Sequence, residues 1–172
     1  DVESGEVTPL SASGLDGSVG GWKWVNASDG DIFTFGGSPD FGAAATHPPQ
    51  RVIIEDESIS FEPLDCADDE DTLRTFHDVV ATESGSIMVI GGLDRDNAST
   101  ESVLLVDDSG NISNKVTLNG SRFAASASVL SSGPLSGSVL VQGGFSLTLT
   151  DDPTKPDLDW TEDGAELYVP VP

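Results

Sequence analysis

The chain has 172 residues, 37% of them hydrophobic, and its 19 glycines and 10 prolines favour many turns within one ordinary domain. Its 30 acidic and 7 basic residues give a net charge of −23, which excludes nucleic acids and anionic membrane surfaces as expected partners. Because the acidic residues are spread along the chain, a solvated surface suited to a halophilic or marine setting is the simplest interpretation. Binding of divalent cations, Ca²⁺ above all, is the alternative.

The start of the chain and its single cysteine bear on the compartment. No apolar run is long enough for a transmembrane helix. Residues 1–6 are polar and do not begin with Met, so we expect an extracellular or cell-surface protein whose signal peptide has been removed; an excised fragment fits equally. Cys66 excludes an internal disulfide, and its acidic neighbours predict a raised thiol pKa and an unreactive thiol.

Short apolar runs separated by turns predict an all-β chain, because no helical apolar period is sustained anywhere in the sequence. Within the Ser-, Gly- and acid-rich residues 1–20, residues 6–10 predict a strand, at a sheet edge because Pro9 lacks an N–H. The next segments predict a loop at 38–49 and four strands, at 20–25, 31–35, 51–55 and 58–62.

Two further units repeat this order. In the second, a strand through Val79 and Val80 turns at Gly85 into the apolar run 87–90, which is typical of a strand buried on both faces. An acidic linker at 65–71 precedes this unit, and strands at 102–106 and 112–118 complete it. The third unit predicts strands at 122–130, 138–142 and 165–169, a long loop at 145–164 and no fourth strand.

A double glycine follows one strand in each unit, at residues 36, 91 and 143, so the unit repeats about every 50 residues. A blade of four short antiparallel strands cannot bury its own faces, so we expect about three blades to stack on one another. The predicted boundaries are an N-terminal segment with a strand able to close a blade, then blades one, two and an incomplete three: 1–20, 21–64, 65–120 and 121–172.

These residues resemble the kelch-repeat β-propeller family, whose pattern is Arg, then His, a turn with Gly, a strand ending in Gly-Gly, and a later strand with a small residue, Glu and Tyr. The first unit matches only at its glycines, with Trp22 and Trp24 in place of the Arg and His strand. The resemblance covers residues 21–170, and the family's Trp after the Tyr is missing throughout, which indicates a divergent prokaryotic type. The matching residues of the second and third units are Arg74, His77, Gly85, Gly91, Gly92 and Arg122, Gly137, Gly143, Gly144, Ala165, Glu166, Tyr168.

The resemblance implies a ring of about five to seven blades, so three blades imply a partial ring or a fragment of a larger propeller. By analogy with propeller closure, the strand near Val7 can supply the strand that the last blade lacks. Uncovered apolar blade faces predict a protein partner or a second copy of the chain that covers them.

The loops after the double glycines are the predicted ligand-binding set, because propeller ligands meet loops gathered on one face. In these loops Phe41, Arg95 and Trp160 are the candidate contact residues, by apolar area or bidentate hydrogen bonding. In the kelch pattern His77 is structural, so we expect it to be packed in the core. His47 is expected in an exposed loop, and no zinc motif is present.

Two further kinds of site remain open. Asp94 and Asp96 resemble the opening of a Ca²⁺ loop, and Asp157 and Asp159 offer a second oxygen-rich loop; solvated loop acids are the alternative. Four asparagines lie in Asn-x-Ser sequons that predict N-glycosylation, although the abundance of serine makes chance matches common. They are Asn26, Asn97, Asn111 and Asn119.

Three functional hypotheses follow. The first is a non-enzymatic binding or structural module of an exported or cell-surface protein, which acts through propeller loops and blade faces in a larger assembly. The second is a fragment of a kelch-type propeller enzyme, an oxidase or a sugar-active enzyme, whose catalytic residues lie outside this chain. The third is an acidic surface-array or appendage subunit that Ca²⁺ stabilises. None of the three places a catalytic residue in the chain.

Overall fold

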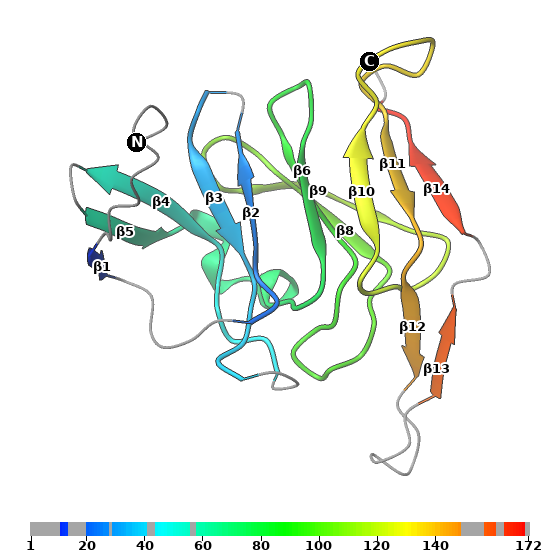
Figure 1. Ribbon diagram of the computed structural model, residues 1–172, viewed down its shortest axis with the longest axis horizontal. Coiled ribbons are helices and arrows are strands. Elements are labelled where there is room, and N and C mark those ends of the chain that lie inside the picture. The colour runs from blue at the N-terminus through cyan, green and yellow to red at the C-terminus, as the bar shows by residue number, and fades with distance from the viewer. Residues whose placement is uncertain are drawn as a thin grey trace, which may run out of the picture.

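A computed structural model describes residues 11–13, 20–27, 29–40, 44–55, 58–148, 157–160 and 164–170. This part of the chain is almost entirely β-structure, as the sequence predicted, with fourteen strands in four sheets and two short 3-10 helices (Figure 1). None of its helices has the length and apolar character that a membrane crossing requires. The elements are β1 (Ser11–Ser13), β2 (Lys23–Asn26), β3 (Ile32–Phe35), β4 (Gln50–Glu55), β5 (Ser58–Pro63), η1 (Asp65–Asp68), η2 (Glu70–Thr72), β6 (Asp78–Ala81), β7 (Ile87–Ile90), β8 (Ser102–Val106), β9 (Ile112–Thr117), β10 (Ser126–Val129), β11 (Val139–Gln142), β12 (Phe145–Thr148), β13 (Asp157–Trp160) and β14 (Ala165–Tyr168).

The first sheet has the order β1-β5-β4-β3-β2, and the pairs among β2 to β5 are antiparallel. β1 adds to the β5 edge of this sheet in parallel, so that Ser11 lies opposite Ser58. Val7, near which the sequence predicted a strand able to complete the last blade, lies outside the described residues. The N-terminal strand that the structure does describe extends the first blade.

The second sheet, β6-β7-β8-β9, is antiparallel, and its strand β7 is buried on both faces. Along β7, Ile87 and Val89 pack against the first sheet, whereas Met88 and Ile90 pack against the third. All four side chains are at most 1% exposed, which confirms the strand with two buried faces that the continuous apolar run predicted. The two hydrophobic cores of the described chain therefore lie on either side of β7.

The third sheet has the order β10-β11-β14, and a separate hairpin of β12 and β13 lies between β11 and β14 in sequence (Figure 1). The prediction of one long loop at 145–164 was therefore wrong at both ends. Leu158 and Trp160 alternate with acids on β13, and they pair with Leu147 and Phe145 on β12. That alternation is the period of a strand, although the acids between the apolar residues are equally typical of a loop.

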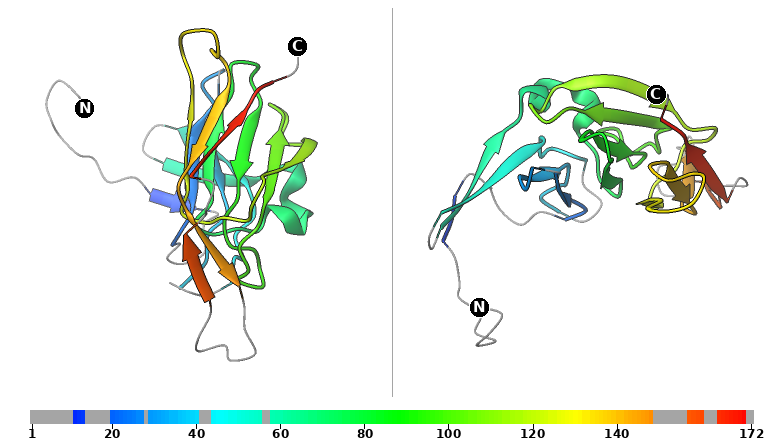
Figure 2. Two further views of the ribbon diagram at one scale, coloured as in Figure 1. Left: turned by 90° about the vertical axis from the view of Figure 1, so that its right-hand side faces the viewer. Right: turned by 90° about the horizontal axis from the view of Figure 1, so that it is seen from above.

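The three larger sheets are arranged as blades in an arc that does not close among the described residues, as the view from above shows (Figure 2). One edge strand from each of the three sheets, β2, β6 and β10, lies on the inner side of the arc, and β6 contacts both of the others. Asp78 at the start of β6 connects them, because its carboxylate pairs with Lys23 Nζ over 3.3 Å and accepts the Ala127 N–H over 2.7 Å.

The first double glycine joins the first blade to the second through the backbone. Gly37 N–H donates to the Arg74 carbonyl over 2.8 Å, and Phe76 N–H donates to the Gly21 carbonyl over 3.3 Å. Gly36 has a φ of 63°, and a Cβ there would lie 1.9 Å from the Arg74 carbonyl oxygen. This close approach of two backbones therefore requires glycine.

The second double glycine makes the same joint between the second and third blades. Gly92 N–H donates to the Arg122 carbonyl over 2.8 Å, and Ala124 N–H donates to the Phe76 carbonyl over 2.7 Å. A Cβ on Gly91 would lie 2.4 Å from the Arg122 carbonyl oxygen. The repeated glycines of the sequence thus mark a repeated two-bond connection between blades.

The side chains of the two matching arginines are buried at these joints. Arg122, 1% exposed, forms an ion pair with Glu166 of β14. Burial lowers the pKa of Arg74 to about 10, so its guanidinium still carries a charge at neutral pH. It donates to three backbone carbonyls, those of Asp71, Gly91 and Ser102, over 2.7, 3.1 and 2.7 Å.

His77 is buried at the first joint, as the sequence predicted for a structural residue. A Cβ added to Gly36 would lie 2.7 Å from its Cε1 atom. Burial, followed by the positive charges of Arg74 and Lys23, lowers the pKa of His77 to about 3, against an opposing effect of the Phe35 backbone. The imidazole is therefore neutral and closely packed at physiological pH.

Candidate functional site

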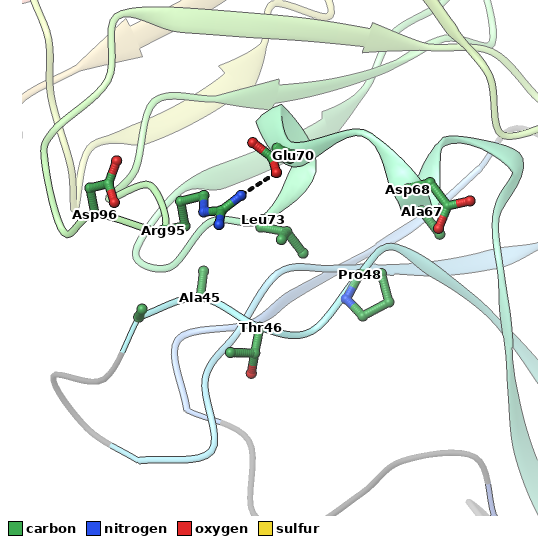
Figure 3. A pocket seen from close by; sticks show the side chains of 10 residues that line it. Ala45, Thr46, Pro48, Ala67, Asp68, Glu70, Leu73, Arg95 and Asp96 are labelled. Atoms are coloured by element: carbon green, nitrogen blue, oxygen red, sulfur yellow. Dashed lines mark ion pairs between the residues drawn. The ribbon is translucent and has the colours of Figure 1, made fainter.

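The candidate site is an open groove of about 630 Å³ at the end of the blades where the β3–β4 and β7–β8 connections lie, here called the loop end (Figure 3). The β3–β4 connection forms one side, and η1, η2 and the β7–β8 connection form the other. Its lining is Ala44, Ala45, Thr46, Pro48, Ala67, Asp68, Glu70, Leu73, Arg95 and Asp96.

The turn that carries Arg95 is fixed by the carboxylate of Asp94. Asp94 Oδ1 accepts the N–H groups of Asp96 and Ala98 over 2.9 and 3.0 Å, and Asn97, with a φ of 60°, donates its N–H to the Asp94 carbonyl over 3.0 Å. An aspartate that bonds the backbone of its own turn is common where a chain reverses tightly. Here it holds Arg95 at the tip of the turn.

The acidic linker beside this turn is held by Lys115 of β9. Lys115 Nζ contacts Asp69 Oδ2 over 3.2 Å and Asp71 Oδ2 over 2.6 Å. The hydrogen bond between Lys115 and Asp71 lowers the pKa of Asp71. Asp69 Oδ1 also accepts the Asp71 N–H over 2.9 Å, which begins η2. With these two carboxylates bound to Lys115, Glu70 between them is left to face the groove (Figure 3).

Arg95 and Glu70 form an ion pair along one side of the groove, between the β7–β8 turn and η2 (Figure 3). The side chains are 49% and 72% exposed, so solvent screens the pair and it contributes little to stability. Both side chains can therefore exchange this contact for one with a ligand. Asp68 and Asp96 add two exposed carboxylates, so the rim of the groove is predominantly negative.

The groove has an apolar component below this charged rim. Ala45 is buried, and Pro48 and Leu73 are half-buried on its two sides (Figure 3). An extended polypeptide that places small apolar side chains on these residues and a basic side chain on the rim matches this chemistry.

Cys66 directly precedes Ala67, one of the lining residues, but its own side chain is buried. Burial raises the pKa of the Cys66 thiol to about 11, so the thiol stays protonated at neutral pH.

The predicted contact residues are divided by the structure. Arg95 lines the groove, whereas Phe41 lies outside the described residues. Trp160 is 75% exposed on β13, where its ring contacts Phe145 with centroids 4.3 Å apart. It ends a row of four aromatic rings that continues through Phe123 to Phe76, with centroid separations of 5.8 and 6.4 Å.

The acids predicted to hold a metal are not gathered into a centre within the described ranges. No group of three or more His, Cys, Asp or Glu side chains suited to a metal ion occurs there. Asp94 is engaged in its own turn, and Asp157 and Asp159 lie on one face of β13. The Ca²⁺ hypothesis stays a prediction for these residues.

The sequon asparagines all lie at strand ends or in turns, and their glycosylation stays a prediction. Asn26 ends β2, and Asn97 lies in the turn after Asp94. Asn111 follows the turn at Gly110, and Asn119 follows β9.

Sequence reasoning missed the acidic side of the groove. Glu70 and Asp68 lie in the linker at 65–71, which we expected only to separate two blades. The available signal was an acidic stretch directly before Arg74, but its approach to the β7–β8 turn depends on how neighbouring blades stack.

Comparison with solved structures identifies the fold as β-propeller-type. The chain is similar to a fungal alcohol oxidase of the AA5 family in complex with copper, with a TM-score of 0.63, 18% identity and coverage of 86% of this chain and 32% of that one. It is also similar to YjhT, with a TM-score of 0.57, 13% identity and coverage of 90% and 47%. The chain thus spans less than half of either propeller. No protein-family profile and no curated protein matches the sequence.

Proposed function

We propose that this chain is a group of kelch-type propeller blades that acts as a non-enzymatic binding module of an exported or cell-surface protein. The observation that carries the proposal is the groove at the loop end, where Arg95 and Glu70 form an exchangeable ion pair above apolar residues. The preferred ligand is an extended polypeptide with basic side chains, because three of the four charged residues on the rim are acidic.

The open face of the first blade supports a second contact within a larger assembly. Trp22 and Trp24 stack with ring centroids 5.6 Å apart, and Trp22 also contacts Phe61 at 6.2 Å. Trp24 is 59% and Ile54 is 55% exposed on the same sheet. Aromatic and branched apolar side chains exposed together are typical of surfaces that another protein covers, so a further blade or a second copy belongs here.

Binding of a fluorescent peptide of alternating Lys and Ala tests the groove. We expect its affinity to fall when Glu70→Lys and Asp96→Lys are combined, because the rim then becomes positive. The matched control combines Asp29→Lys and Glu83→Lys in turns at the opposite end of the blades, with the same change in net charge. Equal loss of affinity in both variants would show that the peptide responds only to overall charge, and the groove would not be the site.

The enzyme-fragment hypothesis has one observation in its favour, the fold similarity to the alcohol oxidase over most of this chain. That similarity is limited to the fold, so oxidase or sugar-directed activity stays a prediction about a longer propeller. It requires turnover by the complete protein that is lost when blades beyond this chain are altered.

The Ca²⁺-stabilised array predicts a solution mass that falls when a chelator is added. Light scattering with and without chelator, at low and high salt, measures this mass directly. A mass that does not respond to chelator would contradict metal-held assembly and leave protein contacts between blade faces as its basis.

A further inference from the structure

We infer that Asn119 is a site of spontaneous deamidation whose product loosens the joint between the second and third blades. Asn119 is exposed in the connection that follows β9, and Gly120 comes next. Among the five asparagines of the sequence, Asn119 alone precedes glycine. A glycine in that position leaves its backbone nitrogen accessible and its backbone free to rotate, and both favour attack on the asparagine side chain.

The reaction is an intramolecular acyl transfer followed by hydrolysis. The backbone nitrogen of Gly120 loses its proton to solvent and bonds to Cγ of Asn119. The bond from Cγ to the amide nitrogen breaks, and ammonia leaves with the proton it needs. Water then opens the resulting cyclic imide at either carbonyl, which gives aspartate or isoaspartate. The balance is one water consumed and one ammonia released.

The local structure leaves this attack unobstructed. A Cβ added to Gly120 would meet no described atom within 4 Å. In the part of the chain that the structure describes, Gly120 N–H donates no hydrogen bond that would have to break before attack. The connection lies outside any β-strand, so no ladder fixes its backbone dihedrals.

Three of the other four asparagines precede a backbone N–H that is already bonded. Ala27 N–H, after Asn26, donates to the Asp31 carbonyl over 2.8 Å, and Ala98 N–H, after Asn97, donates to Asp94. Lys115 N–H donates to the side-chain oxygen of Asn114 itself over 2.8 Å within β9. After Asn111, the branched side chain of Ile112 crowds the attacking nitrogen. These four residues are internal controls.

The consequence follows from the contact that Asn119 makes with the third blade. Asn119 N–H donates to Glu166 Oε2 over 2.7 Å, and Glu166 Oε1 holds the guanidinium of Arg122. Aspartate at position 119 brings a second negative charge next to Glu166. Isoaspartate instead adds a methylene to the main chain between this N–H and Gly120, whose carbonyl faces Arg122 Nε at 3.5 Å. Either product disturbs a hydrogen-bonded, buried ion pair.

Incubation of the whole chain at mildly alkaline pH, after production in a host without N-glycosylation, tests both parts of the inference. Peptide mapping should show conversion at Asn119 ahead of the other four asparagines, and Gly120→Ala should slow it. The converted form, separated by anion exchange, should melt about 2–4 °C below the fresh protein. Conversion at Asn119 no faster than at Asn114 would overturn the site.

The role at the joint has its own test. Asn119→Asp reproduces the charge of one product, and Asn114→Asp adds the same charge at an exposed position within β9. We expect a lower Tm for Asn119→Asp than for the control. Equal Tm values for the two variants, together with an unchanged Tm for the converted protein, would overturn the proposed effect on the joint.

Discussion

Replacement of Gly36 by alanine is the sharpest test of how the blades are joined. The added Cβ would lie 1.9 Å from the Arg74 carbonyl oxygen, so the two backbones must separate, and the hydrogen bond from Gly37 lengthens or breaks. The left-handed backbone of Gly36 costs alanine about 1–2 kcal/mol, the lost hydrogen bond about 1 kcal/mol, and the displaced packing about 1–3 kcal/mol. The total is about 4 kcal/mol, a large part of the stability of an ordinary domain.

The third double glycine provides a matched control for this substitution. Gly143 has a φ of 68°, close to the 63° of Gly36, but a Cβ there would meet no described atom within 4 Å. Gly143→Ala should therefore cost only the backbone strain, about 1–2 kcal/mol. Urea unfolding monitored by tryptophan fluorescence gives both free energies of unfolding. Equal losses in the two variants would refute the close approach of blades as the reason for the glycine repeat.

Two further predictions concern buried charge. Glu166→Gln should destabilise the protein by about 3 kcal/mol, because the guanidinium of Arg122 is 1% exposed and loses its counter-charge. Arg95→Met should change the stability by less than about 1 kcal/mol, because the ion pair of Arg95 with Glu70 is solvated. Thermal melts compare the two, and similar losses would contradict the difference in burial. The pKa of His77 is lowered to about 3 in the folded protein, so the unfolded chain binds the proton first and stability should fall as the pH drops from about 6.5 towards 3. In His77→Gln this part of the pH dependence should disappear from urea titrations, and an unchanged slope would show that other groups cause it.

The parts of the fold that depend on local backbone rules were predictable from the sequence. The double glycines located the ends of three strands, because a residue without Cβ is required where two backbones meet. The apolar run of β7 predicted two buried faces, because successive side chains of a strand point to opposite faces and all four residues of this run are apolar. The repeat pattern correctly predicted that His77 is buried, and the neighbouring acids correctly predicted a raised pKa for the Cys66 thiol, although burial raises that pKa more than the acids do.

The features that were missed depend on contacts between distant segments. In the β12–β13 hairpin, Asp157 and Asp159 masked the alternation of Leu158 and Trp160, and the strand became evident only when paired with β12. Arg95 was a candidate by chemistry alone, but its partner Glu70 is brought close only when the linker packs beside the β7–β8 turn. The groove forms only when the first and second blades pack together. Such contacts between distant segments are harder to predict from one sequence than a turn, which depends on a few adjacent residues.

The position of the second blade between two others has a consequence for cooperativity. Its two faces are covered by sheets that are adjacent to it in the chain, so opening of either outer blade leaves one of its interfaces intact. Stability in such an array is graded, with the slowest amide hydrogen exchange in β7 and faster exchange in the outer sheets. A protein that covers the face of the first blade that carries Trp22 and Trp24 therefore suppresses local unfolding of that blade. Because the first and second blades form the loop-end groove, binding at the tryptophan face also makes the groove more rigid.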